Sequence, residues 1–160
     1  MSNLVEMTMY QISQLFLLPT LALIAALFLY AFWVLGEFLV LAMRRKSGKG
    51  RPLLAHFIRH PKLSDDELDV FAHKLLENQR IASRVTPMLG LVATMIPMGP
   101  ALKSLSDGNL ADVSHNLTIA FSAVILALIA ASITYWAVNV RRRWLAEEIL
   151  EIQALRGANA

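Results

Sequence analysis

Hydrophobic positions along the chain form three long blocks, separated by stretches that are rich in charge. The blocks cover residues 15–43, 86–103 and 117–139. A helix needs about 20 consecutive apolar residues to cross a bilayer, and the second block is only slightly shorter than that. The pattern therefore predicts an all-α integral membrane protein with three transmembrane helices.

The stretch between the first two blocks predicts helices of another kind. "SGKG" at 47–50 ends the helix that leaves the membrane, and "LLAHFIRHP" is a short amphipathic stretch. Ser64 and Glu67 then form the pattern of a capping box, which marks the start of a helix. Apolar residues recur at helical spacing from Leu68 onward, so we expect one helix to run from the box into the second span.

The third block continues into "VRRRWLAEEILEIQALRGANA", which predicts an amphipathic helix beyond the membrane. Two helices, one before the second span and one after the third, thus leave the membrane on the same side. No linker or internal repeat divides the sequence. We therefore interpret residues 1–160 as a single domain.

Lysine and arginine are distributed unevenly, and their distribution predicts the orientation. Residues 1–14 hold none, the stretch 44–84 holds ten, and the connection 103–116 holds only Lys103. The positive-inside rule then places the N-terminus outside, and residues 44–85 and 140–160 in the cytoplasm. We expect the first span not to be a cleavable signal peptide, because it is long and residues 1–14 contain no Lys or Arg.

Composition argues against several classes of function. The chain of 160 residues is 56% hydrophobic and contains no cysteine, which rules out disulfides and thiolate metal sites. His56 and His60 share helical spacing, but Pro61 ends any helix there, so we expect no metal and no cofactor. No Ser-His-Asp arrangement or phosphate loop indicates an enzyme. The basic run at 141–143 is typical of an anchor near anionic lipid, so we expect no nucleic-acid partner.

The second span contains the residues that weaken a helix most. Pro87, Pro97 and Pro100 lie within it, together with Gly90 and Gly99. In lipid, a carbonyl freed by a proline must find a partner inside the protein. We therefore expect this span to face protein or water rather than lipid alone.

Small residues follow one side of the second and third spans, and such stripes let helix backbones approach closely. The positions in the two spans are Gly90, Ala93, Thr94, Pro97 and Ala101, and Ala120, Ala123, Ala127, Ala131 and Thr134. One interpretation is that these two faces simply pack against each other. That interpretation accounts for the alanines, but it leaves the prolines and Thr94 unexplained.

"TPMLGLVATMIPMGPAL", an outside loop and a small-residue span that ends in "AVNVRRRW" together resemble the MotA/TolQ/ExbB proton channel family. The second span of that family usually reads P-x-[LI]-G-L-x-G-T, which corresponds to the stretch from Pro87 to Thr94, with Ala93 in place of the second glycine. "GEFL" at 36–39 is also similar. The resemblance extends over residues 15–150.

This resemblance implies a pentamer in the cell inner membrane, with a pore lined by the second and third spans. It also implies a single-span partner of the ExbD/TolR/MotB type, whose intramembrane aspartate carries the proton through the pore. Proton flow would then drive envelope work or transport, including protein transport. Thr94 would be a pore-lining hydroxyl beside the partner's carboxylate. Pore lining or helix packing would fall to Gly90, Ala93, Pro97, Ala123, Ala127 and Ala131.

The third span departs from the family pattern. Where ExbB and TolQ carry a glutamate and a threonine, this sequence has Ile119 and Val124. The nearest polar groups are Thr118 and Ser122, which share one helix face, and we take them with Thr94 as the hydroxyls of a proton pathway. Because these relay residues are missing, a non-conducting oligomeric scaffold of the same architecture remains as the alternative function. A membrane enzyme or metal-handling protein is the least favoured function.

Glu37 is the carboxylate that lies within a predicted span. It precedes Arg44 by seven residues, which is about two helical turns. One interpretation makes Glu37 part of the proton pathway, as a proton exit or a contact with the partner. The other makes it an interfacial acid, paired with Arg44, Arg45 or the cytoplasmic helices. The sequence leaves both open.

Overall fold

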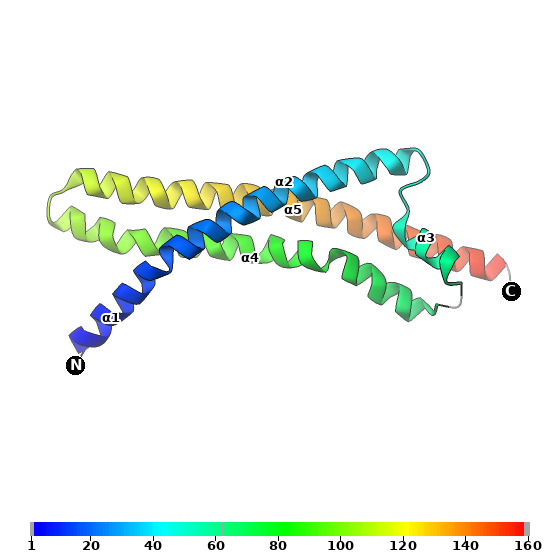
Figure 1. Cartoon of the computed structure of the whole chain (residues 1–160), viewed down its shortest axis with the longest axis horizontal. Coiled ribbons are helices and arrows are strands. Elements are labelled where there is room, and N and C mark those ends of the chain that lie inside the picture. Colours follow the sequence, from blue (N-terminus) through cyan, green and yellow to red (C-terminus); the bar gives the residue numbers. More distant parts are fainter. Residues whose placement is uncertain (1, 62, 159–160) are drawn as a thin grey trace. The chain divides into compact units, whose positions relative to one another are not determined.

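The computed structural model describes residues 2–61 and 63–158, and over these residues the chain forms five helices and no strand (Figure 1). The helices are α1 (Ser2–Leu15), α2 (Leu17–Lys46), α3 (Pro52–Arg59), α4 (Asp65–Ser106) and α5 (Leu110–Ala158). Three helical stretches, those of α2, α4 and α5, are long and apolar enough to cross a membrane. The predicted all-α chain with three candidate spans is confirmed at this level. Lys62, one of the ten basic residues counted above, lies outside the described residues.

A proline and a glycine define the two ends of α2. Pro19 has no N–H, and its ring is incompatible with a helical carbonyl at Leu15, where α1 ends. At the other end, Gly48 has a φ of +74°, a conformation that glycine adopts without strain. The N–H of Gly48 donates to the carbonyl of Arg45 at 3.0 Å, and the N–H of Lys49 donates to that of Arg44 at 3.1 Å. This Schellman motif ends α2 within the predicted "SGKG" segment.

The predicted capping box begins α4. The backbone N–H of Ser64 donates to Glu67 Oε2 at 2.8 Å, and the N–H of Glu67 donates to Ser64 Oγ at 3.2 Å. From this point α4 continues without interruption through Pro87, Pro97 and Pro100. A single helix therefore leads from the box into the second span, as expected.

The connection between α4 and α5 is shorter than the predicted loop at 103–116. The N–H of Asn109 donates to the carbonyl of Ser104 at 2.9 Å, and Gly108, with a φ of +73°, completes the same type of C-terminal motif as in α2. The side-chain oxygen of Asn109 then accepts from the N–H of Asp112 at 3.3 Å and caps α5. One turn thus ends one helix and begins the next, so most of the polar residues around it are helical.

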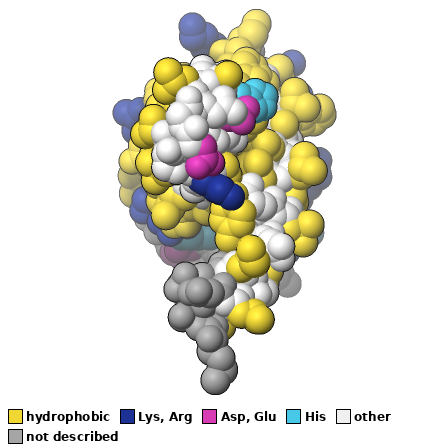
Figure 2. Space-filling view, turned by 90° about the vertical axis from the view of Figure 1, so that its left-hand side faces the viewer, with side chains coloured by type: hydrophobic (Ala, Val, Ile, Leu, Met, Phe, Trp, Pro, Cys, Tyr) yellow, Lys and Arg dark blue, Asp and Glu magenta, His cyan; other side chains and the backbone are white. Residues whose placement is uncertain are grey.

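The chain divides into two compact units, which are considered separately. The first unit comprises Met1–Ala31 and Ser83–Ser132. Its core is small: Ile24 of α2 packs with Ala93 of α4 and with Ala123 and Ala127 of α5. Many large apolar side chains stay exposed around it, as Figure 2 shows at the end of the molecule that carries the α4–α5 turn. A bilayer or other protein subunits would cover such a surface.

The second unit comprises Phe32–Ala82 and Ile133–Ala160. Its core joins α3, α4 and α5 through the apolar stripes that the sequence predicted. The buried members are Leu53, Leu68, Ala72, Leu76, Leu145 and Ile152. The prediction that residues 1–160 form one domain stays a prediction.

Candidate functional site

Thr94, the predicted pore-lining hydroxyl, lies on α4 in the first unit and is half-buried. Its Oγ1–H donates to the carbonyl oxygen of Leu91 at 2.7 Å. A threonine hydroxyl has one donor and two acceptor positions. Because the donor is directed to the helix backbone, Thr94 in this conformation presents an acceptor to a neighbouring group.

Thr118 and Ser122 lie on α5, also in the first unit, and both side chains are exposed. The hydroxyl of Thr118 donates to the carbonyl of Ser114 at 2.8 Å. Within the described ranges, no hydrogen bond joins Thr94 to either of these hydroxyls. The structure therefore places the three predicted pathway residues in the same unit without linking them.

The small residues of the first unit bring α4 and α5 close together. A Cβ built on Gly90 would lie 2.9 Å from the Cβ of Ala127, closer than real side chains approach. All six predicted packing or pore-lining residues are buried, namely Gly90, Ala93, Pro97, Ala123, Ala127 and Ala131. The small-residue faces of α4 and α5 therefore pack against each other within one chain. Their burial supports the packing interpretation, whereas a pore-lining role for them stays a prediction.

Glu37 is exposed on α2 in the second unit and forms an ion pair with α5. Its Oε1 lies 3.1 Å from Nη1 of Arg141, a side chain that is only 10% exposed. The sequence analysis considered Arg44, Arg45 or the cytoplasmic helices as partners, and the partner proves to be Arg141 at the start of the α5 extension. This pairing agrees with the interpretation of Glu37 as an interfacial acid.

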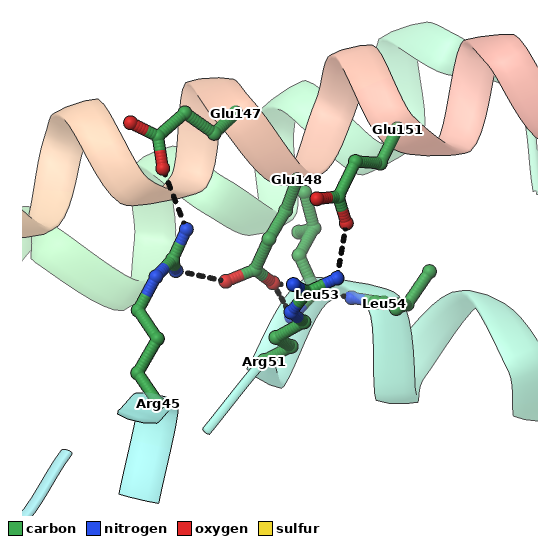
Figure 3. Close-up of polar contacts among 7 residues, drawn as sticks. All are labelled: Arg45, Arg51, Leu53, Leu54, Glu147, Glu148 and Glu151. Carbon is green, nitrogen blue, oxygen red and sulfur yellow. Dashed lines mark hydrogen bonds and ion pairs between the residues drawn. The ribbon is translucent and has the colours of Figure 1, made fainter. Parts of the chain in front are cut away.

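The most elaborate polar site of the second unit surrounds Glu148 of α5 (Figure 3). The side chain of Glu148 is 1% exposed, and its Oε1 accepts from Nη1 of Arg45 at 2.9 Å. Its Oε2 accepts from the backbone N–H of Leu53 at 2.9 Å and from that of Leu54 at 3.3 Å. Arg45 also reaches the exposed Glu147, with its Nη2 at 2.7 Å from Oε2.

Helix geometry explains why the first turn of α3 needs this carboxylate. Pro52 occupies its first position, and the side chain of Arg51, at the N-cap, makes no capping hydrogen bond. The next N–H groups, those of Leu53 and Leu54, lack partners within the helix. Glu148 of α5 supplies the missing acceptor from a distant part of the chain. Arg51 pairs with Glu151, which also belongs to α5, with Nη1 at 2.6 Å from Oε2.

Burial raises the pKa of Glu148 above its ordinary value of 4.5, because the charged form loses contact with water. The backbone N–H groups of Leu54 and Leu53 and the Arg45 guanidinium oppose that rise, since each favours the carboxylate. Glu148 thus couples the end of α2, the start of α3 and α5 through one carboxyl group.

The sequence analysis missed Glu148, although one signal was present. Glu148 follows Leu145 by three residues and precedes Ile152 by four, so it lies on the apolar stripe of the extension rather than on its polar face. An acid in such a stripe requires a buried partner. The sequence does not show that the partners would come from α2 and α3.

The histidine pair considered for metal binding lies in and beyond α3. The ring of His56 stacks on Phe71, with 4.1 Å between the centroids, and lies 5.1 Å from the ring of His60. Over the residues that the structure describes, no cluster of three or more potential metal ligands occurs.

Comparison with known proteins identifies one family. The MotA/TolQ/ExbB proton channel family matches residues 66–154, which is more than half of the chain and includes nearly all of α4 and most of α5. No curated protein and no solved structure matches the chain. Thr94 and Glu148 lie inside the matched segment, whereas Glu37 and Arg45 lie outside it.

Proposed function

Because the chain belongs to the MotA/TolQ/ExbB proton channel family, we propose that it is the channel subunit of a membrane complex energised by the proton-motive force. Thr94 carries this proposal, because it places a half-buried hydroxyl in the apolar part of α4 that contains its three prolines. The subunit would couple proton flow to envelope work or to transport, including protein transport. It would act without a cofactor and without enzymatic chemistry of its own.

The proposed location is the cell inner membrane, with the N-terminus outside and the C-terminus in the cytoplasm. The distribution of basic residues supports this orientation. Residues 44–85 and 140–160 would then be cytoplasmic, and the α4–α5 turn would lie outside.

The proposed assembly is a pentamer around a single-span partner of the ExbD/TolR/MotB type that carries an intramembrane aspartate. Since the small-residue faces are buried within one chain, contacts between copies would use the large apolar side chains that remain exposed. Those on α4 and α5 include Met88, Leu91, Met95, Phe121 and Ile125.

In the proposed ion path, the acid that carries the proton belongs to the partner. When protonated, its O–H would donate to Thr94 Oγ1, whose own hydrogen is directed to Leu91. Thr118 and Ser122 would extend the path outward with exposed hydroxyls. This arrangement fits a chain whose second and third predicted spans contain no carboxylate.

A second candidate function is a non-conducting scaffold of the same architecture. The pairing of Glu37 with Arg141 favours it, because the acid of the predicted first span is then held by a counter-charge rather than left to move protons. Both candidates assume the same fold and assembly. They differ only in whether protons cross.

Proton uptake into liposomes tests the role of Thr94. Thr94→Val keeps the shape and removes the hydroxyl, leaving the partner's carboxyl without its acceptor. An unsatisfied polar group costs about 1–3 kcal/mol, so uptake should fall about 5- to 150-fold. Ser132→Ala, which removes another hydroxyl that is bonded within α5, should leave uptake unchanged. Glu37→Gln should have a smaller effect than Thr94→Val. Equal uptake by Thr94→Val and the parent would show that Thr94 is not in the path.

A further inference from the structure

Pro100 leaves one carbonyl of the second span without its usual helical donor. A helical carbonyl normally accepts from the N–H four residues later, and the residue four positions after Ile96 is a proline without an N–H. In an apolar environment, such a carbonyl requires another donor. The structure provides one: Nε2 of Gln14 donates to the carbonyl oxygen of Ile96 at 3.2 Å.

A second contact lies next to the first. A Cβ built on Gly99 would lie 3.5 Å from Cε2 of Tyr10, which is ordinary van der Waals contact. Tyr10 and Gln14 are four residues apart in α1 and therefore share one face of that helix. All four residues belong to the first unit. The face of α1 that holds Tyr10 and Gln14 thus lies against the part of α4 that contains its last two prolines.

We propose that Gln14 is a positioning residue for the ion path and that α1 braces the Pro97–Pro100 segment of α4. The side-chain amide of Gln14 takes the place of the missing N–H of Pro100. It thereby fixes the peptide plane of Ile96, two residues after Thr94. Without this donor, the carbonyl is left to water and the segment loses a fixed geometry. The functional part rests on the proposed role of Thr94, whereas the docking of α1 does not.

The family match does not supply this inference. The matched residues begin at 66, so α1 lies outside them. The sequence alone does not supply it either, because nothing in the residues around Gln14 indicates which distant carbonyl it contacts.

A double-mutant cycle tests the brace, because Pro100→Ala restores the missing N–H within α4. Gln14→Leu keeps a side chain of similar length but removes the donor. Hydrogen exchange at the amides of Met98, Gly99 and Ala101, measured for the full chain in nanodiscs, reports opening of the segment. In the parent, Gln14→Leu should speed exchange about 5- to 150-fold, as expected when a half-buried acceptor loses its donor.

The double variant decides the mechanism. With Ala at position 100, Gln14→Leu should change the exchange rate by less than about threefold, because α4 then satisfies Ile96 by itself. Gln11→Leu is the matched control, since Gln11 is an exposed residue of the same helix, and it should leave exchange unchanged in both backgrounds. An equal effect of Gln14→Leu with Pro or Ala at position 100 would overturn the proposal, and so would no effect in either.

Proton uptake separates a positioning role from a purely structural one. With the partner present, Gln14→Leu should lower uptake, and Pro100→Ala in the same chain should restore part of it. If exchange responds but uptake does not, Gln14 stabilises α4 without positioning the path, and that part of the proposal falls. If the parent itself does not conduct, the proposed channel function fails, while the exchange cycle still decides whether α1 docks through Gln14.

Discussion

Replacing Glu148 with alanine should release the start of α3 from α5. The substitution removes the acceptor of the Leu53 and Leu54 N–H groups and one of the two carboxylates that hold Arg45. Because burial raises the pKa of Glu148, ionising the group in the folded state lowers stability rather than adding to it. The loss comes instead from the groups that the substitution leaves without partners.

The magnitude follows from the burial of those groups. Leu53 is fully buried, so its N–H loses its partner outright, at about 1–3 kcal/mol, whereas the N–H of the half-buried Leu54 regains some contact with water. Arg45 keeps Glu147, which limits the penalty on that side. We expect a total of about 3 kcal/mol, which corresponds to about a 150-fold increase in the open population.

Hydrogen exchange at the α3 amides measures this population in the full chain in nanodiscs. Glu147→Ala is the matched control, because Glu147 is the neighbouring residue, contacts the same arginine and is 53% exposed. An exposed ion pair contributes about 0–1 kcal/mol, so Glu147→Ala should speed exchange by no more than about fivefold. Equal effects of the two substitutions would refute the reasoning, because the stability lost would then not depend on how deeply each glutamate is buried.

Three further predictions concern other parts of the chain. The folded state binds the Glu148 proton more tightly than the unfolded state does, so the stability of the second unit should fall as the pH rises from 4.5 through the raised pKa. Unfolding midpoints measured across this pH range should show the fall, and Glu148→Gln should flatten it. Gly90→Ala should cost about 1–3 kcal/mol of stability and lower the thermal midpoint, because the added Cβ would lie 2.9 Å from the Cβ of Ala127. Gly36→Ala should leave the midpoint unchanged, because the space around Gly36 is open. A cysteine at Asp107 should react with an impermeant thiol reagent from outside intact cells and one at Ser47 should not; the opposite labelling would overturn the orientation.

The end of α2 and the start of α4 could be predicted from the sequence because their causes are local. The capping box at Ser64 and Glu67 and the glycine after α2 act within a few residues of the helix ends that they define. The apolar blocks likewise report directly on a membrane environment. The 103–116 connection was predicted too long because polar residues near a tight turn can cap helices as readily as they form loops.

The polar contacts of the candidate sites could not be predicted in the same way. Glu148 meets Arg45 and Leu53 across about 100 residues of sequence, and Gln14 meets Ile96 across 82. The sequence contains the groups that need partners, an acid in an apolar stripe and a backbone carbonyl without its helical donor. Which residues serve as the partners depends on which helices pack together, and only the folded chain shows that.

Proton uptake by the parent chain is the most direct test of the central claim. Liposomes would contain the full chain with a co-purified single-span protein that carries an intramembrane aspartate, and a pH-sensitive dye would report internal acidification under an imposed gradient. We predict uptake that requires both proteins and disappears when the partner's aspartate is replaced by asparagine. Liposomes with both intact proteins that remain as proton-tight as empty ones would contradict the channel function and favour the scaffold.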